Sequence, residues 1–241
     1  MERYWLVHWD MRGQEPYVQE NLPFPCVNLV FEQGNPRIYG VVTGKSTRLL
    51  ENEGRAFGVK FKPGGFYPFI KAPVSQLTDS SISFDDELGV DAKPWEEAIF
   101  ALEAEGKMVE LVEQFLRERL PERDENVTLI NQIVDLIIAD RTITKVDDVV
   151  KRVHLNKRTL QRLFNQYVGI SPKWVIKGYR LQEAAEKLEK GDDADSTRIA
   201  LELGYFDQAH FIKDFKTIVG RTPAEYAKHI SLGVVSSLNT E

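Results

Sequence analysis

The 241-residue sequence predicts an α+β protein in two parts: a small antiparallel β barrel or sandwich, followed by an all-α domain in which one helical unit occurs twice. Two observations support this fold class. Residues 1–90 contain short runs rich in aromatic and β-branched residues, separated by turns with Gly and Pro, as in short antiparallel strands. Between Thr144 and Tyr226, a residue pattern recurs at an offset of 51 positions (Leu160 to Phe211), which indicates two copies of one supersecondary unit.

Short strands in the β-rich part are bounded by turn residues, which break extended structure. Aromatic side chains in a small barrel can fill its core or line a ligand pocket. Within residues 4–9, alternation puts His8 on one face and Trp5 and Trp9 on the other, and the sequence leaves open which face points inward. Strands are predicted over residues 4–9, 27–31, 38–43, 47–50 and 56–61, and the candidate pocket residues are Trp5, Trp9, Phe31, Tyr39 and Phe66.

A helical connector is predicted between the two parts. Pro94 begins a helix that Gly106 should stop, and a second helix over 107–120 has its apolar residues on one side. That side can pack on the barrel, on the all-α domain or on a second copy of the chain, and packing within the chain is the default. The charged run at 122–125 reads as a linker. The predicted domains are residues 1–93, 94–125 and 126–230, with a loose tail over 231–241.

Each copy of the repeated unit consists of a helix, a tight turn and a second helix, which is the outline of a helix-turn-helix. The second helix ends at a Gly, and Ser or Thr followed by Pro starts the next helix with a hydroxyl N-cap. These positions are Gly169 and Ser171 in the first copy, and Gly220 and Thr222 in the second. We name the copies unit one (residues 144–172) and unit two (residues 196–223).

The second helix of unit one has two different faces. Leu160, Leu163 and Phe164 form an apolar stripe that should face the core. The opposite face carries arginine and amide side chains at i, i+3, i+4 and i+7, which can form bidentate hydrogen bonds with guanine or adenine edges. Such a face is more often only solvated, but its place within a repeated unit favours DNA binding. The candidate DNA contacts of unit one are Lys157, Arg158, Gln161, Arg162 and Asn165.

Unit two presents a different set of side chains. The offset of 51 maps the four base-reading candidates of unit one onto Ala209, Ile212, Lys213 and Lys216. Ala209 can contact a thymine methyl group, and Lys213 can reach a phosphate or a guanine edge. Unit one should therefore carry most of the sequence discrimination, while unit two supplies position and affinity. The candidate DNA contacts of unit two are Gln208, Ala209, His210, Lys213 and Lys216.

Residues 126–230 resemble the DNA-binding domain of the AraC/XylS family of transcription regulators. The resemblance implies two helix-turn-helix units joined by a long helix, here over 172–190, and a sequence-specific DNA-binding transcription regulator. The β-rich part, mainly residues 57–66, resembles the sensor-like N-terminal domain of some of these regulators, and a cupin-like fold follows by analogy. This implies control by a small molecule or partner at that domain. The motifs lie at residues 158–164, 169–172, 199–205, 210–211 and 220–226.

Charge is distributed unevenly along the chain. The whole chain has a net charge of −6, but residues 140–230 contain 17 Lys and Arg against 13 Asp and Glu, which gives +4 there and −10 elsewhere. The basic excess lies with the repeat, as phosphate binding requires. Double-stranded DNA is therefore the predicted partner, and a small-molecule effector and a homodimer are further expectations.

The sequence offers little for catalysis or metal binding. Its four histidines have no ligand spacing, its one cysteine, Cys26, excludes an internal disulfide, and no phosphate loop or nucleophile motif is present. We therefore expect no cofactor, no metal and no enzymatic activity. Two alternatives stay open: a cupin-like enzyme fused to a DNA-binding module, using Glu32, Lys60 or His8, or a DNA-binding adaptor without a ligand. Since no long apolar run or signal peptide is seen, a cytoplasmic location is expected.

Overall fold

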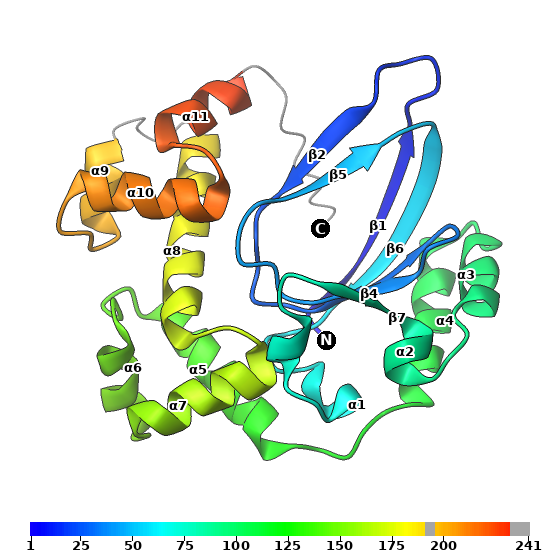
Figure 1. The fold of residues 1–241 in the computed structure, drawn as a ribbon, viewed down its shortest axis with the longest axis horizontal. Helices are drawn as coiled ribbons and strands as arrows, with labels where there is room; N and C mark the ends of the chain where they lie inside the picture. Colours follow the sequence, from blue (N-terminus) through cyan, green and yellow to red (C-terminus); the bar gives the residue numbers. More distant parts are fainter. Residues whose placement is uncertain (191–195, 232–241) are drawn as a thin grey trace.

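Two antiparallel sheets form the first part of the computed structural model, which describes residues 1–190 and 196–231. The larger sheet has the strand order β1-β6-β3-β4-β7, and the smaller sheet pairs β2 with β5. Figure 1 shows β2 and β5 beside the long, curved strands β1 and β6. This arrangement confirms the predicted α+β class with an antiparallel β part. The strands are β1 (Arg3–Asp10), β2 (Tyr17–Asn21), β3 (Asn28–Glu32), β4 (Arg37–Tyr39), β5 (Ser46–Leu50), β6 (Glu53–Lys60) and β7 (Ser81–Ser83).

The sequence-based prediction lacks β2 and β7, and it makes β4 too long. β2 includes the polar residues Gln19 and Glu20, so it has a weak apolar signal, and β7 has only three residues. β4 ends at Tyr39 because the 3₁₀ helix η1 (Val74–Leu77) packs directly against the next residue, Gly40. A Cβ atom at Gly40 would lie 1.7 Å from the carbonyl oxygen of Leu77, so only glycine fits there.

On one face of the large sheet, Trp5 and Trp9 of β1 lie across β6. The register pairs Trp5 with Gly58 and Trp9 with Gly54. A Cβ atom at Gly58 would lie 2.1 Å from the Trp5 ring, and one at Gly54 would lie 2.1 Å from the Trp9 ring. The two glycines therefore leave the space that both indoles occupy above the neighbouring strand.

The opposite face of the large sheet belongs to the hydrophobic core. Phe31 points to this face, where it is 0% exposed and its ring centroid lies 5.8 Å from that of Phe115. Phe66 is 1% exposed and packs edge-on against Phe61 at 5.1 Å. The prediction that Phe31 and Phe66 line a pocket together with the tryptophans of β1 is therefore wrong, because both phenylalanines are packed core residues.

Short helices cover the core face of the sheet. The apolar side of α4, which includes Met108, Val112 and Phe115, is buried within the chain, so it packs on its own β part. Gly106 does not stop a helix, contrary to the prediction: α3 ends at Phe100, and Gly106 lies in the first turn of α4. The helices are α1 (Tyr67–Ile70), α2 (Phe84–Leu88), α3 (Lys93–Phe100) and α4 (Glu105–Arg117).

The all-α part follows, with the long helix α8 joining the two helix-turn-helix units (Figure 1). A π-helical turn, η2, extends the second helix of unit one. Over the described ranges 1–190 and 196–231, no helix has the length and apolar character needed to cross a bilayer. The elements are α5 (Glu125–Ala139), α6 (Val146–Val153), α7 (Lys157–Leu163), η2 (Phe164–Val168), α8 (Pro172–Glu189), α9 (Ser196–Glu202), α10 (Gln208–Val219) and α11 (Pro223–Ser231).

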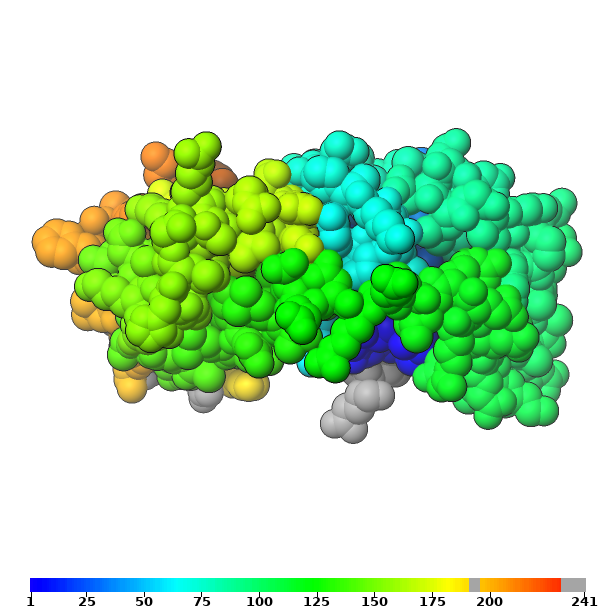
Figure 2. All heavy atoms as spheres, turned by 90° about the horizontal axis from the view of Figure 1, so that it is seen from below, coloured from blue at the N-terminus to red at the C-terminus, as the bar shows by residue number. Residues whose placement is uncertain are grey.

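The two units join the rest of the chain in different ways. One cluster of buried apolar residues runs from the sheets through α5, α6 and α7 to Val175 and Ile176 in the first half of α8. A second cluster begins at Leu181 and contains the buried residues of α9, α10 and α11. Figure 2 shows the yellow-green surface of α7 and η2 running without a break into the cyan region around α1. Unit one therefore shares its core with the β part, whereas unit two has a core of its own.

Candidate nucleic-acid interface

Local capping rules build the turn of unit one. α6 ends at His154, which has a left-handed backbone with a φ of 54°. Asn156 then caps α7, because its side chain accepts a hydrogen bond from the Thr159 amide at 2.8 Å. The offset of 51 aligns Val153 with Gly204, the left-handed residue of unit two, so the left-handed position in unit one lies one residue later than the repeat predicts.

The turn of unit two keeps the same cap. Asp207 lies 51 positions after Asn156, and its carboxylate accepts a hydrogen bond from the His210 amide at 2.7 Å, which starts α10. Before it, Tyr205 packs its ring edge-on against Phe211, with the centroids 5.4 Å apart. Burial, followed by the nearby Asp214 carboxylate, raises the pKa of Tyr205 well above its ordinary value. The second helix of each unit, α7 or α10, therefore starts at a fixed point relative to the helix before it.

Both units also end in the same way. Gly169 closes η2 with a φ of 93°, and Gly220 closes α10 with a φ of 85°, both in the left-handed region that glycine adopts at low cost. Two residues later, Ser171 accepts a hydrogen bond from the Trp174 amide at the start of α8, and Thr222 accepts one from the Glu225 amide at the start of α11. The repeat seen in the sequence is thus a repeat of caps.

The α7 face predicted to bind DNA is exposed. The side chains of Arg158, Gln161 and Arg162 all point away from the buried side of the helix, and within the described part of the chain these side chains form no hydrogen bond or ion pair. Two neighbours are already engaged. Lys157 Nζ lies 3.0 Å from an Asp147 carboxylate oxygen, and Asn165 Oδ1 accepts a hydrogen bond from Ser75 Oγ at 3.3 Å. Asn165 thus lies at the boundary with η1 of the β part.

The α10 face is exposed as well, but its side chains differ. Ala209, Lys213 and Lys216 are exposed, and in the described ranges neither lysine forms an ion pair. Gln208 donates a hydrogen bond to Ser196 Oγ at 2.7 Å, and His210 Nε2 lies 3.4 Å from an Asp214 carboxylate oxygen. Of the unit two candidates, the alanine and the two lysines are therefore available without breaking a contact.

A second cluster of candidate residues lies on the tryptophan face of the β part. Glu32 of β3 and Tyr39 of β4 share this face with Trp5, as the register of the sheet requires. The Arg48 guanidinium of β5 pairs with the Glu32 carboxylate and lies 3.4 Å from the Tyr39 hydroxyl. Burial lowers the pKa of Arg48 and raises that of Tyr39. The predicted residues Trp5, Trp9 and Tyr39 thus lie beside a charged pair that links the two sheets.

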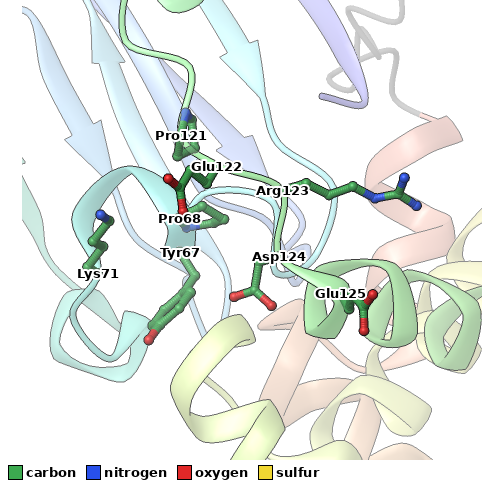
Figure 3. Close-up of a pocket in the computed structure, with 8 residues that line it drawn as sticks. All are labelled: Tyr67, Pro68, Lys71, Pro121, Glu122, Arg123, Asp124 and Glu125. Atoms are coloured by element: carbon green, nitrogen blue, oxygen red, sulfur yellow. The ribbon is translucent and has the colours of Figure 1, made fainter.

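A polar pocket of about 380 Å³ lies between α1 and the segment that leads into α5 (Figure 3). Tyr67 OH accepts a hydrogen bond from Gln166 Nε2 at 2.7 Å, and Asp124 accepts one from Tyr167 OH at 2.8 Å. The Tyr67 and Tyr167 rings lie 4.0 Å apart. In Figure 3 the Arg123 side chain extends away from these groups. The lining residues are Tyr67, Pro68, Lys71, Pro121, Glu122, Arg123, Asp124 and Glu125.

This pocket is absent from the sequence-based prediction because its walls come from segments far apart in the chain. It lies at the contact between the β part and unit one, where Gln166 donates its hydrogen bond to Tyr67. Over the described ranges, no group of three or more histidine, cysteine or carboxylate side chains is arranged to hold a metal ion.

Comparison with known proteins gives two family matches. Residues 149–229 match the family described as a helix-turn-helix domain, and residues 1–83 match a domain of unknown function, DUF6597. An uncharacterized HTH-type transcriptional regulator of Haemophilus influenzae is 33% identical over 87 residues, which cover 36% of this chain and 29% of that protein. The chain spans less than half of the length of this relative and of several others.

A shorter relative is covered more completely. The probable transcription factor PqrA of Proteus vulgaris is 32% identical over 85 residues, which cover 35% of this chain and 69% of PqrA. Among solved structures, a transcriptional regulator of Chromobacterium violaceum with an AraC-type DNA-binding domain is 27% identical and has a TM-score of 0.38. The match covers 41% of this chain and 88% of the chain of that regulator. With its matched helix-turn-helix domain and its likeness to PqrA, the chain belongs to the AraC/XylS family of transcription regulators.

Proposed function

We propose that this DNA-binding transcription regulator reads its operator by placing α7 and α10 in successive major grooves on one face of the duplex. The observation that carries the proposal is that the side chains of Arg158, Gln161 and Arg162 are exposed and unpaired within the described residues. All three lie on one side of α7. Side chains held apart from acidic neighbours in this way are available for another acceptor.

The chemistry of these groups fits base edges. An arginine fork can bond guanine O6 and N7, and a glutamine amide can bond adenine N6 and N7, each pair discriminating by about 1–3 kcal/mol against a wrong base. On unit two, Lys213 and Lys216 suit phosphate oxygens. Lys157 has to exchange its Asp147 partner for a phosphate, so we expect its contribution to be smaller.

The test is a selection of genomic fragments with the full-length protein, followed by sequencing and binding measurements. A shared motif with two half-sites about 34 Å apart, one helical turn, supports the proposal. Fragments that share no motif would contradict sequence-specific reading. The variants that assign individual residues are treated in the Discussion.

The finer part of the proposal concerns control by a small molecule. The tryptophan face of the β part combines the apolar surfaces of Trp5 and Trp9 with the polar groups of Tyr39, Arg48 and Glu32. One Glu32 carboxylate oxygen is buried with no hydrogen-bond partner in the described structure. A few fixed polar groups within an apolar surface are typical of small-molecule sites. We therefore expect an effector with an apolar body and a polar group that competes with Arg48 or Glu32 for its partner in the ion pair.

Such an effector would act on unit two through the smaller sheet. Arg48 is paired in register with Gln19, and the next residue, Glu20, reaches Arg221 in the turn before α11. Unit two has its own core, and the β part meets this region through few contacts, which include the packing of Leu22 and the hydrogen bond from Gln182 Nε2 of α8 to the Pro23 carbonyl oxygen. A shift of β2 and β5 would therefore change the placement of unit two more easily than that of unit one. This is a shift of population between arrangements with different DNA affinity.

A thermal-shift screen of the full-length protein against metabolites and metal ions tests this part. A ligand at about 100 times its Kd should add roughly 2.7 kcal/mol of stability. Arg48→Ala should remove the response, and Arg55→Ala, a change of a sheet arginine on the opposite face, should keep it. Turnover of a ligand in the presence of a metal would favour the enzyme alternative, and no response to any compound would favour the adaptor.

A further inference from the structure

Phe206 is the most exposed of the large apolar side chains in the described structure, at 97%. It lies in the turn between α9 and α10, directly before Asp207, the N-cap of α10. Solvent exposure of one apolar residue is ordinary on its own. Here the residue lies at the leading end of a recognition helix, which is the end that contacts base edges in helix-turn-helix proteins.

The fold of unit two does not use this side chain. Its counterpart 51 positions earlier, Leu155, is partly buried and packs against the large core cluster. In unit two, the Tyr205 ring provides the packing against Phe211 and the unit two core instead. The Phe206 ring is therefore left facing solvent.

Phe206 and Ala209 are exposed apolar groups at the leading end of α10, beside the polar residues Asp207, Gln208 and His210. Ala209, the second residue of α10, is exposed and presents a methyl group. The Gln208 amide donates a hydrogen bond to Ser196 Oγ at 2.7 Å, and the Asp207 carboxylate accepts one from the His210 amide at 2.7 Å. Lys213 and Lys216 follow further along the helix and place positive charge where phosphates are expected. The leading end of unit two thus offers apolar contact, in contrast to the forked side chains of unit one.

We infer that Phe206 and Ala209 make unit two a reader of thymine methyl groups in the major groove. Thymine is the one DNA base with an apolar group on its major-groove edge, the C5 methyl, and phenylalanine and alanine are suited to contact it. The inference rests on the proposed DNA-binding function and assigns a specific chemistry to unit two. Discrimination there depends on burying a methyl group, whereas in unit one it depends on hydrogen bonds.

The experiment uses the full-length protein and the site selected from genomic fragments. Each thymine is replaced in turn by deoxyuridine, which removes the methyl group and keeps base pairing. Affinity should fall about fourfold at one or two positions of one half-site, as expected for one buried methyl group. Replacing the same T·A pair by 5-methylcytosine·G keeps a methyl group in the groove and should lose less affinity than cytosine·G.

The Phe206→Ala variant links this effect to the residue. Because Phe206 is 97% exposed, the variant should keep the melting temperature of the parent. It should bind the thymine site more weakly and no longer distinguish thymine from uracil at the affected position. Phe206→Leu should restore part of the discrimination, and Leu201→Ala, a change of another exposed apolar residue on α9, should leave it intact.

Other outcomes overturn the inference. A selected site without thymines in one half-site, or methyl discrimination that persists in Phe206→Ala, removes the assigned contact. Unchanged DNA binding with a loss of self-association in sedimentation would assign Phe206 to a protein interface instead. Absence of any specific DNA binding by the parent protein is a separate result, because it refutes the proposed function.

Discussion

Glu20 on β2 accepts a hydrogen bond from Arg221, 201 positions later in the chain, with Arg221 Nη2 2.8 Å from Glu20 Oε1. Lys45 Nζ lies 2.9 Å from the same oxygen, so one carboxylate holds two cations. These three side chains are each about a quarter exposed. They form a polar joint between the smaller sheet and the turn that precedes α11.

The first prediction concerns this joint. Glu20→Gln keeps the shape of the side chain but removes its charge, which leaves Arg221 and Lys45 as two neighbouring cations without a carboxylate. We expect faster hydrogen exchange at the backbone amides of residues 220–226, measured by mass spectrometry, with no change in α6 or α7. Glu51→Gln, which neutralises an exposed carboxylate outside the joint, is the matched control. Equal protection of residues 220–226 in Glu20→Gln and the parent would show that the joint does not hold unit two.

The second prediction separates base reading from phosphate contact. Arg162→Ala should cost about 1–3 kcal/mol of binding free energy and relax the preference at one base position. Lys213→Ala should weaken all sites alike, because a phosphate contact carries no sequence information. Both are measured on a library of single-base variants of the selected site, with Lys107→Ala on α4 as a control lysine. A profile that Arg162→Ala leaves unchanged but Lys213→Ala alters would reverse the assignment.

The third prediction concerns salt. Each phosphate neutralised by the protein should contribute about −0.9 to the slope of log K against log salt concentration. Lys213→Ala should therefore make the slope less steep by about one. Lys173→Ala should act in the same way, because its exposed ammonium is expected to contact the phosphate backbone of the DNA. Titrations by fluorescence anisotropy at several salt concentrations give the slopes. Affinity that does not depend on salt would argue against DNA as the partner.

The fourth prediction tests the packing of the β part. Gly58→Ala would place a Cβ atom 2.1 Å from the Trp5 ring, so we expect a loss of about 1–3 kcal/mol in the free energy of unfolding. Gly106→Ala meets nothing within 4 Å in the first turn of α4 and should stabilise by up to about 1 kcal/mol. Urea unfolding of both variants provides the comparison. Equal stability of the two would mean that Trp5 does not lie over Gly58 in solution.

The sequence by itself determined the repeat and its local chemistry. Asn156 and Asp207 cap the recognition helices, and Ser171 and Thr222 cap the helices that follow. Each of these caps depends on a side chain and a backbone amide three positions away, so the linear order of residues contains the whole interaction. For the same reason, the exposed face of α7 could be predicted from helical spacing around the buried Leu160.

Only the tertiary structure decided which distant segments meet. It places Phe31 in the core and Trp5 on the other face, because the helices cover only one side of the large sheet. It merges the core of unit one with that of the β part while leaving unit two separate. It also brings Glu20 to Arg221. These outcomes depend on packing between segments up to about two hundred positions apart, a distance at which neither helical nor strand periodicity carries information.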